Sequence, residues 1–293
     1  MFFAASRRGC ALQSLPACAR FRPIFSPAAS QPAVSAAAAP LSCQDFREVM
    51  TTTATTQRIL PIHSPLFVPP EQLIGCRDLR QLFAQPDRPL ALEIGCGIGD
   101  FMAELAAANP MTNFIAIDIY NKGCLKTCRR LEKAGLNHVR VLRVEARYLL
   151  HQHCPANSLS AVYINCPDPW PKKRHRDRRL VNGDFLRLLL CCLTDDGRLH
   201  FASDVANYAN QVACLLAGIE GYVQPGATAV TTALPGYPLS KYMRRFLAGN
   251  LPIYFIARHR QAGLQLSEAD RPALPTGFRT RHPHPANGQE LGP

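Results

Sequence analysis

The 293-residue sequence has no apolar run that approaches the ~20 residues a helix needs to cross a bilayer, so we expect no integral membrane protein. It also has no C-x-x-C pair, although it contains 12 cysteines. That spacing argues against a zinc site or a disulfide framework. We therefore expect scattered, reduced thiols, no bound metal and a reducing, cytoplasmic compartment. Charged residues make up only 18% and hydrophobic residues 47%, which excludes a chain that is disordered throughout.

Acidic residues are missing from the start of the chain, where Asp45 is the first and four arginines precede it. Basic residues with Ala, Ser and Pro but no acids are typical of an organellar targeting segment. Two other interpretations stay open: translation starts at Met50, or residues 1–59 are a plain disordered extension. In each case we expect one folded domain over residues 60–260. Residues 261–293 are rich in proline and predict a disordered tail.

Positive charge exceeds negative charge, since 33 Lys and Arg face 21 Asp and Glu, a net charge of +12. Most of the excess lies in two segments. Residues 172–179 hold six Lys and Arg against one acid, and residues 241–260 hold five against none. Such clusters indicate a nucleic-acid partner, although a ribosome-associated or membrane-surface protein can have the same balance.

Predicted strands and helices alternate from residue 90 onward. The predicted strands are residues 90–94, 113–119, 139–144, 159–165, 198–202, 227–232 and 253–257. The predicted helices are residues 101–108, 122–134, 184–193 and 207–219. Repeated βα units predict a doubly wound α/β fold with a mostly parallel, seven-stranded sheet. In such folds ligands bind at the carboxyl ends of the strands.

The first predicted strand contains Glu93 and leads into a glycine-rich loop. The loop contains Gly95, Gly97, Gly99 and Asp100. The glycines allow tight turns and a close approach of the backbone to a ligand. A dinucleotide-binding loop has its third glycine where this chain has aspartate. The pattern instead resembles the E-x-G-x-G-x-G signature of class I (Rossmann-like) methyltransferases that use S-adenosyl-L-methionine.

Acids also end the second and third predicted strands, at Asp118 and Glu145. A carboxylate offers two acceptor oxygens, so Asp118 is suited to bind the two hydroxyls of a ribose. The methyltransferase resemblance implies that Glu145 lies where the adenine ring binds.

The most specific motif, Pro167-Asp168-Pro169-Trp170, follows the fourth predicted strand after Cys166. The two prolines restrict the backbone on both sides of Asp168. Trp170 is the only tryptophan, and the basic run 172–179 follows it. A rigid acid, a flat ring and a basic run together suit the binding of a base and its phosphate backbone.

These residues resemble the tRNA (guanine-N7-)-methyltransferase family of the bacterial single-subunit type, which modifies the guanine at position 46. The family signature P-D-P-W-x-K-x-R-H is met at residues 167–170, Lys172, Arg174 and His175. The strand-five pattern A-x-D-x-x-x-Y is met from Ala202 to Tyr208. The resemblance covers roughly residues 60–260.

The resemblance also implies roles for individual residues. The implied cofactor-side residues are Glu93, Gly95, Gly97, Gly99, Asp118, Glu145 and Asp168. The implied substrate-side residues are Lys172, Arg174, His175, Asp204, Ser240 and Lys241. Asp168 doubles as the catalytic acid. The family's late T-x-x-E element begins here at Ser240 but ends in Met243. The resemblance implies that the family's carboxylate pairs with the guanine N1–H and N2–H edge, where a thioether is a poor replacement.

The predicted reaction is methyl transfer from S-adenosyl-L-methionine to guanine N7 in tRNA, by a monomer, with a homodimer left open. N7 carries no proton, so we expect Asp168 to orient the base and stabilise its developing positive charge rather than abstract a proton. We expect residues 172–179 and 241–245, with Arg258 and Arg260, to hold phosphates. The alternatives are a class I methyltransferase for another substrate, a non-catalytic RNA-binding relative suggested by Met243, and a nicotinamide-dependent oxidoreductase, which the loop spacing disfavours.

Overall fold

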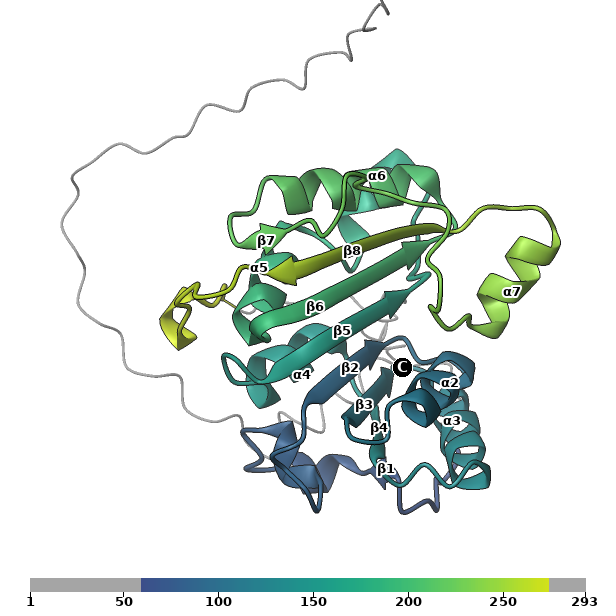
Figure 1. The fold of residues 1–293 in the computed structure, drawn as a ribbon. Coiled ribbons are helices and arrows are strands. Elements are labelled where there is room, and N and C mark those ends of the chain that lie inside the picture. The colour runs from purple at the N-terminus through teal and green to yellow at the C-terminus, as the bar shows by residue number, and fades with distance from the viewer. Residues whose placement is uncertain (1–58, 274–293) are drawn as a thin grey trace, which may run out of the picture. The chain divides into compact units, whose positions relative to one another are not determined.

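The computed structural model describes residues 59–273, so the predictions for residues 1–58, for a start at Met50 and for residues 274–293 lie outside it (Figure 1). Strands and helices alternate in this part of the chain. The strands are β1 (Phe67–Val68), β2 (Leu90–Ile94), β3 (Asn113–Asp118), β4 (Val139–Arg143), β5 (Leu159–Asn165), β6 (Leu193–Ser203), β7 (Tyr222–Val223) and β8 (Tyr254–Arg260). The helices are α2 (Asp100–Ala108), α3 (Asn121–Lys133), α4 (Ala146–His153), α5 (Gly183–Cys192), α6 (Ala206–Ala217) and α7 (Lys241–Ala248). Short 3₁₀ helices span Pro70–Leu73, Leu79–Leu82, Lys173–Arg178 and Glu268–Asp270.

The eight strands form one sheet in the order β1-β4-β3-β2-β5-β6-β8-β7. Strands β1 to β6 pair in parallel, whereas β8 runs antiparallel to both β6 and β7. The chain leads outward from β2 through β3 to β4 and then returns to β5 on the other side of β2. In a parallel sheet such a reversal leaves a crevice at the carboxyl ends of the two central strands, here after Ile94 and Asn165. The predicted doubly wound α/β fold is confirmed.

The sheet is covered on both faces because its central strands are apolar throughout. All five residues of β2 are buried, as expected for a central parallel strand. Leu92 and Ile94 pack in one apolar cluster with residues of α4, α5 and α6, whereas Ala91 packs in a second cluster with residues of α2 and α3. Neighbouring residues of a strand point to opposite faces, so β2 supplies side chains to both layers.

The structure corrects several element predictions. The predicted strand at residues 227–232 is wrong, since only Thr231 forms an isolated bridge, to Phe255, and the edge strand is the shorter β7. With β1 at the other edge, the sheet has eight strands rather than seven. Helices α4 and α7 were not predicted, because each has only 8 residues and too few turns to display a clear helical period.

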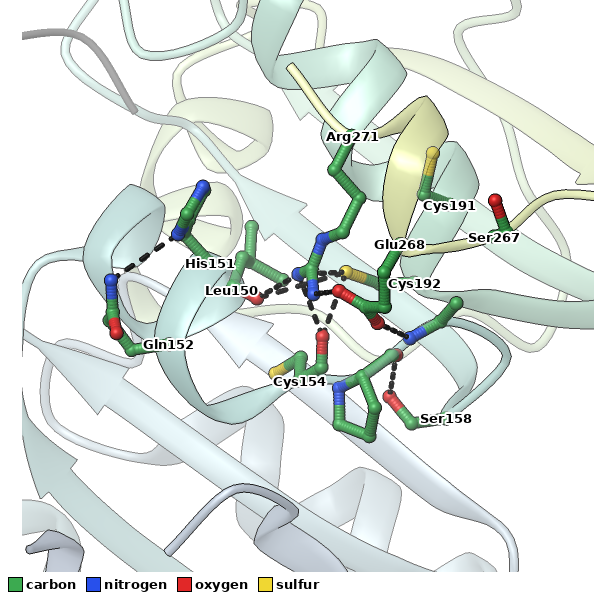
Figure 2. A network of polar contacts seen from close by, with 12 residues as sticks. Leu150, His151, Gln152, Cys154, Ser158, Cys191, Cys192, Ser267, Glu268 and Arg271 are labelled. Atoms are coloured by element: carbon green, nitrogen blue, oxygen red, sulfur yellow. Dashed lines mark hydrogen bonds and ion pairs between the residues drawn. The ribbon is translucent and has the colours of Figure 1, made fainter. Parts of the chain in front are cut away.

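The segment 261–273 differs from the tail predicted there, because its side chains bond to the domain. Figure 2 shows Arg271 inserted between the ends of α4 and α5, where its guanidinium donates to the carbonyl oxygens of Leu150 and Cys154. Glu268 forms an ion pair with Arg271 and accepts a hydrogen bond from the backbone N–H of Ala156 at 2.7 Å. The folded part of the chain therefore extends past Arg260.

Candidate functional site

The glycine loop between β2 and α2 needs glycine at its turning points. Gly95, Gly97 and Gly99 have φ values of 83°, 58° and 77°, in the left-handed region that other residues rarely adopt. A Cβ added to Gly95 or Gly97 meets no atom within 4 Å, so open space lies beside the loop there. A Cβ on Gly123 of α3, by contrast, would lie 2.6 Å from the carbonyl oxygen of Gly97. The loop is thus held closely from behind and open on the side where a ligand can approach.

Glu93 lies just before this loop and is almost completely buried. Its Oε2 atom has no hydrogen-bond partner among residues 59–273. Burial raises the pKa of Glu93 to about 8, although the neighbouring Asn165 amide opposes the rise. Asn165 ends β5 and accepts a hydrogen bond of 2.8 Å from the Tyr237 hydroxyl. An unpaired carboxyl oxygen at this edge of the sheet is suited to a ligand that carries a hydrogen-bond donor, and a positively charged ligand would favour the ionised form that burial disfavours.

Asp118 ends β3 and braces the glycine loop. Its Oδ2 accepts a hydrogen bond from the Gly97 N–H at 2.9 Å, and its Oδ1 accepts one from the Tyr120 N–H at 2.9 Å. Burial raises the pKa of Asp118, and the charge of Asp168 adds to the rise, while the backbone donors oppose it. A carboxylate can accept about four hydrogen bonds, so both oxygens keep capacity for a ligand. Its predicted ribose contact stays a prediction.

Glu145 caps the helix that follows β4. Its side chain accepts hydrogen bonds from the Tyr148 N–H at 3.0 Å and from Arg147 Nε at 2.8 Å. It therefore has a structural role that the sequence did not predict, because α4 was not predicted. Its predicted contact with adenine is not tested by these contacts.

The loop after β5 holds Asp168 at the carboxyl edge of the sheet, with its side chain exposed. Cys166 and Trp170, on either side of it, have φ values of 46° and 40°. Such conformations cost ~1–3 kcal/mol each and are enriched at functional sites. The loop is anchored at both ends, since the Cys166 N–H donates to the Ala202 oxygen at 2.9 Å and Arg179 Nε donates to the Pro169 oxygen at 2.8 Å. The motif predicted from the sequence is therefore a rigid loop that presents an acid.

The basic run forms a surface around Trp170. The guanidinium of Arg178 lies 5.0 Å above the Trp170 ring, and His175 meets the ring edge-on at 5.8 Å. Partial desolvation and the positive charges of Arg178, Arg174 and Lys172 lower the pKa of His175. A bound phosphate is expected to oppose that shift, because a negative charge favours the protonated ring. The exposed members of the run are Lys172, Lys173, Arg174 and Arg178.

Three arginines expected to hold phosphates are wrongly assigned, because they are buried: Arg179 and Arg260 are each 1% exposed and Arg258 is 4% exposed. The Arg179 guanidinium lies 4.4 Å above the ring of Tyr208. Arg260 donates to the backbone oxygens of Leu193 and Leu264. These guanidinium groups satisfy backbone carbonyls or pack on rings inside the fold, so RNA cannot reach them.

The predicted substrate-side residues of β6 and α7 lie together. Asp204 follows β6, and its Oδ2 accepts a hydrogen bond of 3.0 Å from the Tyr242 hydroxyl. Ser240 caps α7 by accepting a hydrogen bond from the Met243 N–H at 3.2 Å, and Lys241 is exposed. Met243 is completely buried in an apolar cluster that includes Ala202, Ile253 and Phe255. Met243 therefore faces the core and cannot contact a base.

Sequence reasoning missed Asn165, Tyr237 and Tyr242. Asn165 could have been found, because it ends a predicted strand at the edge where ligands bind. Tyr237 and Tyr242 lie far along the chain from the residues they bond, and no sequence signal pairs them.

Nine cysteines in residues 59–273 are free, and the same residues contain no group of three or more His, Cys, Asp or Glu side chains placed to hold a metal ion. No helix in this range is long and apolar enough to cross a membrane.

Comparison with known proteins gives consistent matches. Residues 87–256 match the model of the family described as putative methyltransferase. The chain is 52% identical over 225 residues to the tRNA (guanine-N(7)-)-methyltransferase of Syntrophotalea carbinolica, a match that covers 77% of this chain and 97% of that protein. It is 50% identical over 207 residues to the protein of the same name from Geobacter metallireducens, covering 70% and 98% of the two chains. Residues 87–256, which the family model matches, contain the glycine loop, the Asp168 loop and α7.

Proposed function

The chain belongs to the tRNA (guanine-N(7)-)-methyltransferase family, and we propose that it transfers a methyl group from S-adenosyl-L-methionine to N7 of a guanine in tRNA. The observation that carries this proposal is the doubly anchored loop that presents Asp168 within electrostatic reach of Asp118 and directly before an exposed basic run. We further propose that the guanine is at position 46, in the variable loop, and that the protein acts in the cytoplasm as a monomer.

The residues of the crevice fit the methyl donor. When bound, S-adenosyl-L-methionine supplies a methyl group on a positively charged sulfonium. The unpaired Oε2 of buried Glu93 offers an acceptor for an ammonium group or another donor of that molecule. Asp118 offers acceptor oxygens for its ribose, and the backbone at Gly95 and Gly97 leaves space for close approach. Glu145 at the start of α4 completes the proposed cofactor side.

The chain's own carboxylates then account for the chemistry at the base. Guanine N7 has a free lone pair and no proton, so no side chain needs to act as a general base. The methylated purine carries a positive charge, and Asp168 and Asp204 stabilise that charge as it develops. Holding the base in line with the methyl group supplies most of the remaining reduction in the activation free energy, since orienting two reactants can lower it by up to ~7–11 kcal/mol. The strained, doubly anchored loop gives Asp168 the rigidity that this positioning requires.

The exposed basic side chains hold the tRNA backbone. Lys172, Lys173, Arg174 and Arg178 line the loop beside Asp168, and Lys241 lies at the start of α7. Contacts between cations and phosphates release counterions, so affinity for tRNA should fall steeply as salt concentration rises. Phosphate contacts fix the position of the RNA, while the carboxylates select the base.

The test is to incubate the purified protein with unmodified tRNA and labelled S-adenosyl-L-methionine, and to map the methylated nucleotide. We expect 7-methylguanosine at one position, with activity strongly reduced in Asp168→Asn. Methylation of another nucleoside, or of protein but not tRNA, would support a class I methyltransferase with a different substrate. Binding of both ligands without turnover would support the non-catalytic relative.

The pH dependence separates the two possible roles of Asp168. If Asp168 orients and stabilises, the wild-type rate shows no essential deprotonation near neutral pH. A deprotonation step near neutral pH that disappears in Asp168→Asn would refute the role proposed for this residue, while leaving the reaction itself unchanged.

A further inference from the structure

Tyr242 lies beside the predicted base-binding carboxylate of Asp204 and is itself half exposed. It belongs to the first turn of α7, and 46% of its surface is exposed. Its hydroxyl donates to Asp204 Oδ2 at 3.0 Å. Its ring lies 4.6 Å from the ring of Phe246, one helical turn further along, with 33° between the two planes. Tyr242 is therefore held at its hydroxyl and on one side of its ring, while much of its surface faces solvent.

The surroundings of this ring point to a nucleic-acid ligand. Lys241, Arg244 and Arg245 flank it on the same helix and are exposed, and Arg244 forms an ion pair with Glu104. A flat ring set among cations is the arrangement by which proteins stack an unpaired base while they hold its backbone. The neighbouring residue, Met243, takes no part, because its side chain is completely buried.

We propose that Tyr242 is a substrate-contacting residue that stacks on the target guanine and orients Asp204 toward the guanine N1–H and N2–H edge. This inference rests on the proposed function. It accounts for recognition of the base in a chain that has methionine at position 243, where the family motif has a carboxylate.

The hydrogen-bond capacity of Asp204 permits both contacts. A carboxylate accepts about four hydrogen bonds, and the Tyr242 hydroxyl uses one of them. Partial burial, together with the hydrogen bond to Asp204, raises the pKa of Tyr242 to about 12, so its hydroxyl keeps the proton that it donates. The remaining lone pairs of Asp204 can accept the two N–H groups of a guanine.

Stacking on Tyr242 also suits the reaction, because methylation at N7 turns the guanine into a cation. An aromatic face attracts a cation more strongly than a neutral ring of the same shape. The contact therefore strengthens as the charge develops, and interactions that are stronger in the transition state increase the rate. Loss of the ring should lower kcat as well as tRNA affinity.

The experiment compares Tyr242→Leu, Tyr242→Phe and Leu247→Ala for kcat and KM with unmodified tRNA. Leu247 is an exposed apolar residue of the same helix, so Leu247→Ala is the matched control. Tyr242→Leu should lower kcat/KM on the order of tenfold to a hundredfold, the range expected from loss of base–aromatic stacking. Leu247→Ala should keep wild-type activity, and all three variants should keep wild-type affinity for S-adenosyl-L-methionine. Wild-type kcat/KM in a folded Tyr242→Leu would overturn the stacking role.

A second measurement tests the hydroxyl and does not depend on the folding of Tyr242→Leu. The substrate is tRNA with inosine, which lacks the N2 amino group, in place of the target guanosine. The wild-type protein should prefer guanosine, and both Tyr242→Phe and Asp204→Asn should reduce that preference. An unchanged preference in Tyr242→Phe would overturn the orienting role. If the wild-type protein makes no 7-methylguanosine in tRNA, the proposed function fails. If the wild-type protein is active and the Tyr242 variants are equally active and selective, this inference alone fails.

Discussion

Substitution of Arg271 by alanine tests whether the segment 261–273 stabilises the domain or is the tail that composition predicts. The Arg271 side chain is 7% exposed, and its guanidinium donates to the Leu150 oxygen and, at 2.8 Å, to the Cys154 oxygen. These carbonyls lie at the end of α4, where the last turn of a helix leaves acceptors without partners within the helix. A positive charge at that end also interacts favourably with the helix dipole. Arg271 thus completes a helix from a part of the chain more than a hundred residues away.

The size of the effect follows from these contacts. A hydrogen bond that involves a charged group contributes ~1.5–3 kcal/mol, and Arg271 makes two of them to buried carbonyls. Its ion pair with Glu268 adds little, about 0–1 kcal/mol, because Glu268 is 60% exposed. Partial replacement of the lost bonds by water reduces the sum. We expect Arg271→Ala to lower the free energy of unfolding by about 2–4 kcal/mol.

Urea unfolding followed by circular dichroism measures this change as a shift in midpoint at constant slope. The control is Arg187→Ala on α5, whose ion pair with Asp184 at 3.2 Å is largely exposed. Arg187→Ala should change the free energy of unfolding by less than about 0.5 kcal/mol. If Arg271→Ala is as mild as the control, the segment 261–273 contributes no stability, and the tail predicted from composition is the better description.

Three further outcomes test other parts of the structure. The pKa of Glu93 rises from 4.5 to about 8 on folding, so the free energy of unfolding should fall as pH rises through that window, by on the order of a few kcal/mol in total. Urea titrations at pH 5 and pH 9 measure this fall, and Glu93→Gln should remove it. An equal fall in the wild-type protein and in Glu93→Gln would refute the role of Glu93. Gly123→Ala, normally favourable in a helix, should weaken S-adenosyl-L-methionine binding measured by calorimetry, because its Cβ would lie 2.6 Å from the Gly97 oxygen; unchanged affinity would show that the loop moves freely. Lys173→Ala should reduce the salt slope of tRNA binding by about one, whereas Arg258→Ala should lower stability instead; the reverse result would show that the buried arginine is the phosphate ligand.

The fold class and the edge of the sheet that carries the candidate site could be predicted because their signals are local. The glycines of residues 95–99 adopt backbone conformations with positive φ that favour glycine. The apolar strands are recognisable within five to seven consecutive residues. Parallel strands bring their carboxyl ends together, so Glu93, Asp118 and Asp168 could be placed at one edge before any contact was known. The short helix α4 escaped prediction, and with it the capping role of Glu145.

The exposure of the basic residues could not be predicted in the same way. Arg178 and Arg179 are neighbours in one basic run, yet Arg178 is exposed above Trp170 and Arg179 is buried against Tyr208. Arg260 likewise ends a strand inside the fold, bonded to Leu193 and Leu264. Composition counts each of these as one positive charge, whereas only the packing of distant residues decides which charges face solvent.

By itself the sequence determined the βα alternation, the glycine loop and the rigid Asp168 motif, because each depends on residues close together along the chain. Only the tertiary structure decided that Met243 faces the core, that Tyr242 meets Asp204 and that Arg271 completes α4. These contacts join residues 38 and more than a hundred positions apart. The sequence does not show these contacts because a buried or hydrogen-bonded side chain finds its partner on another helix or strand. Which partner it meets depends on how those elements pack.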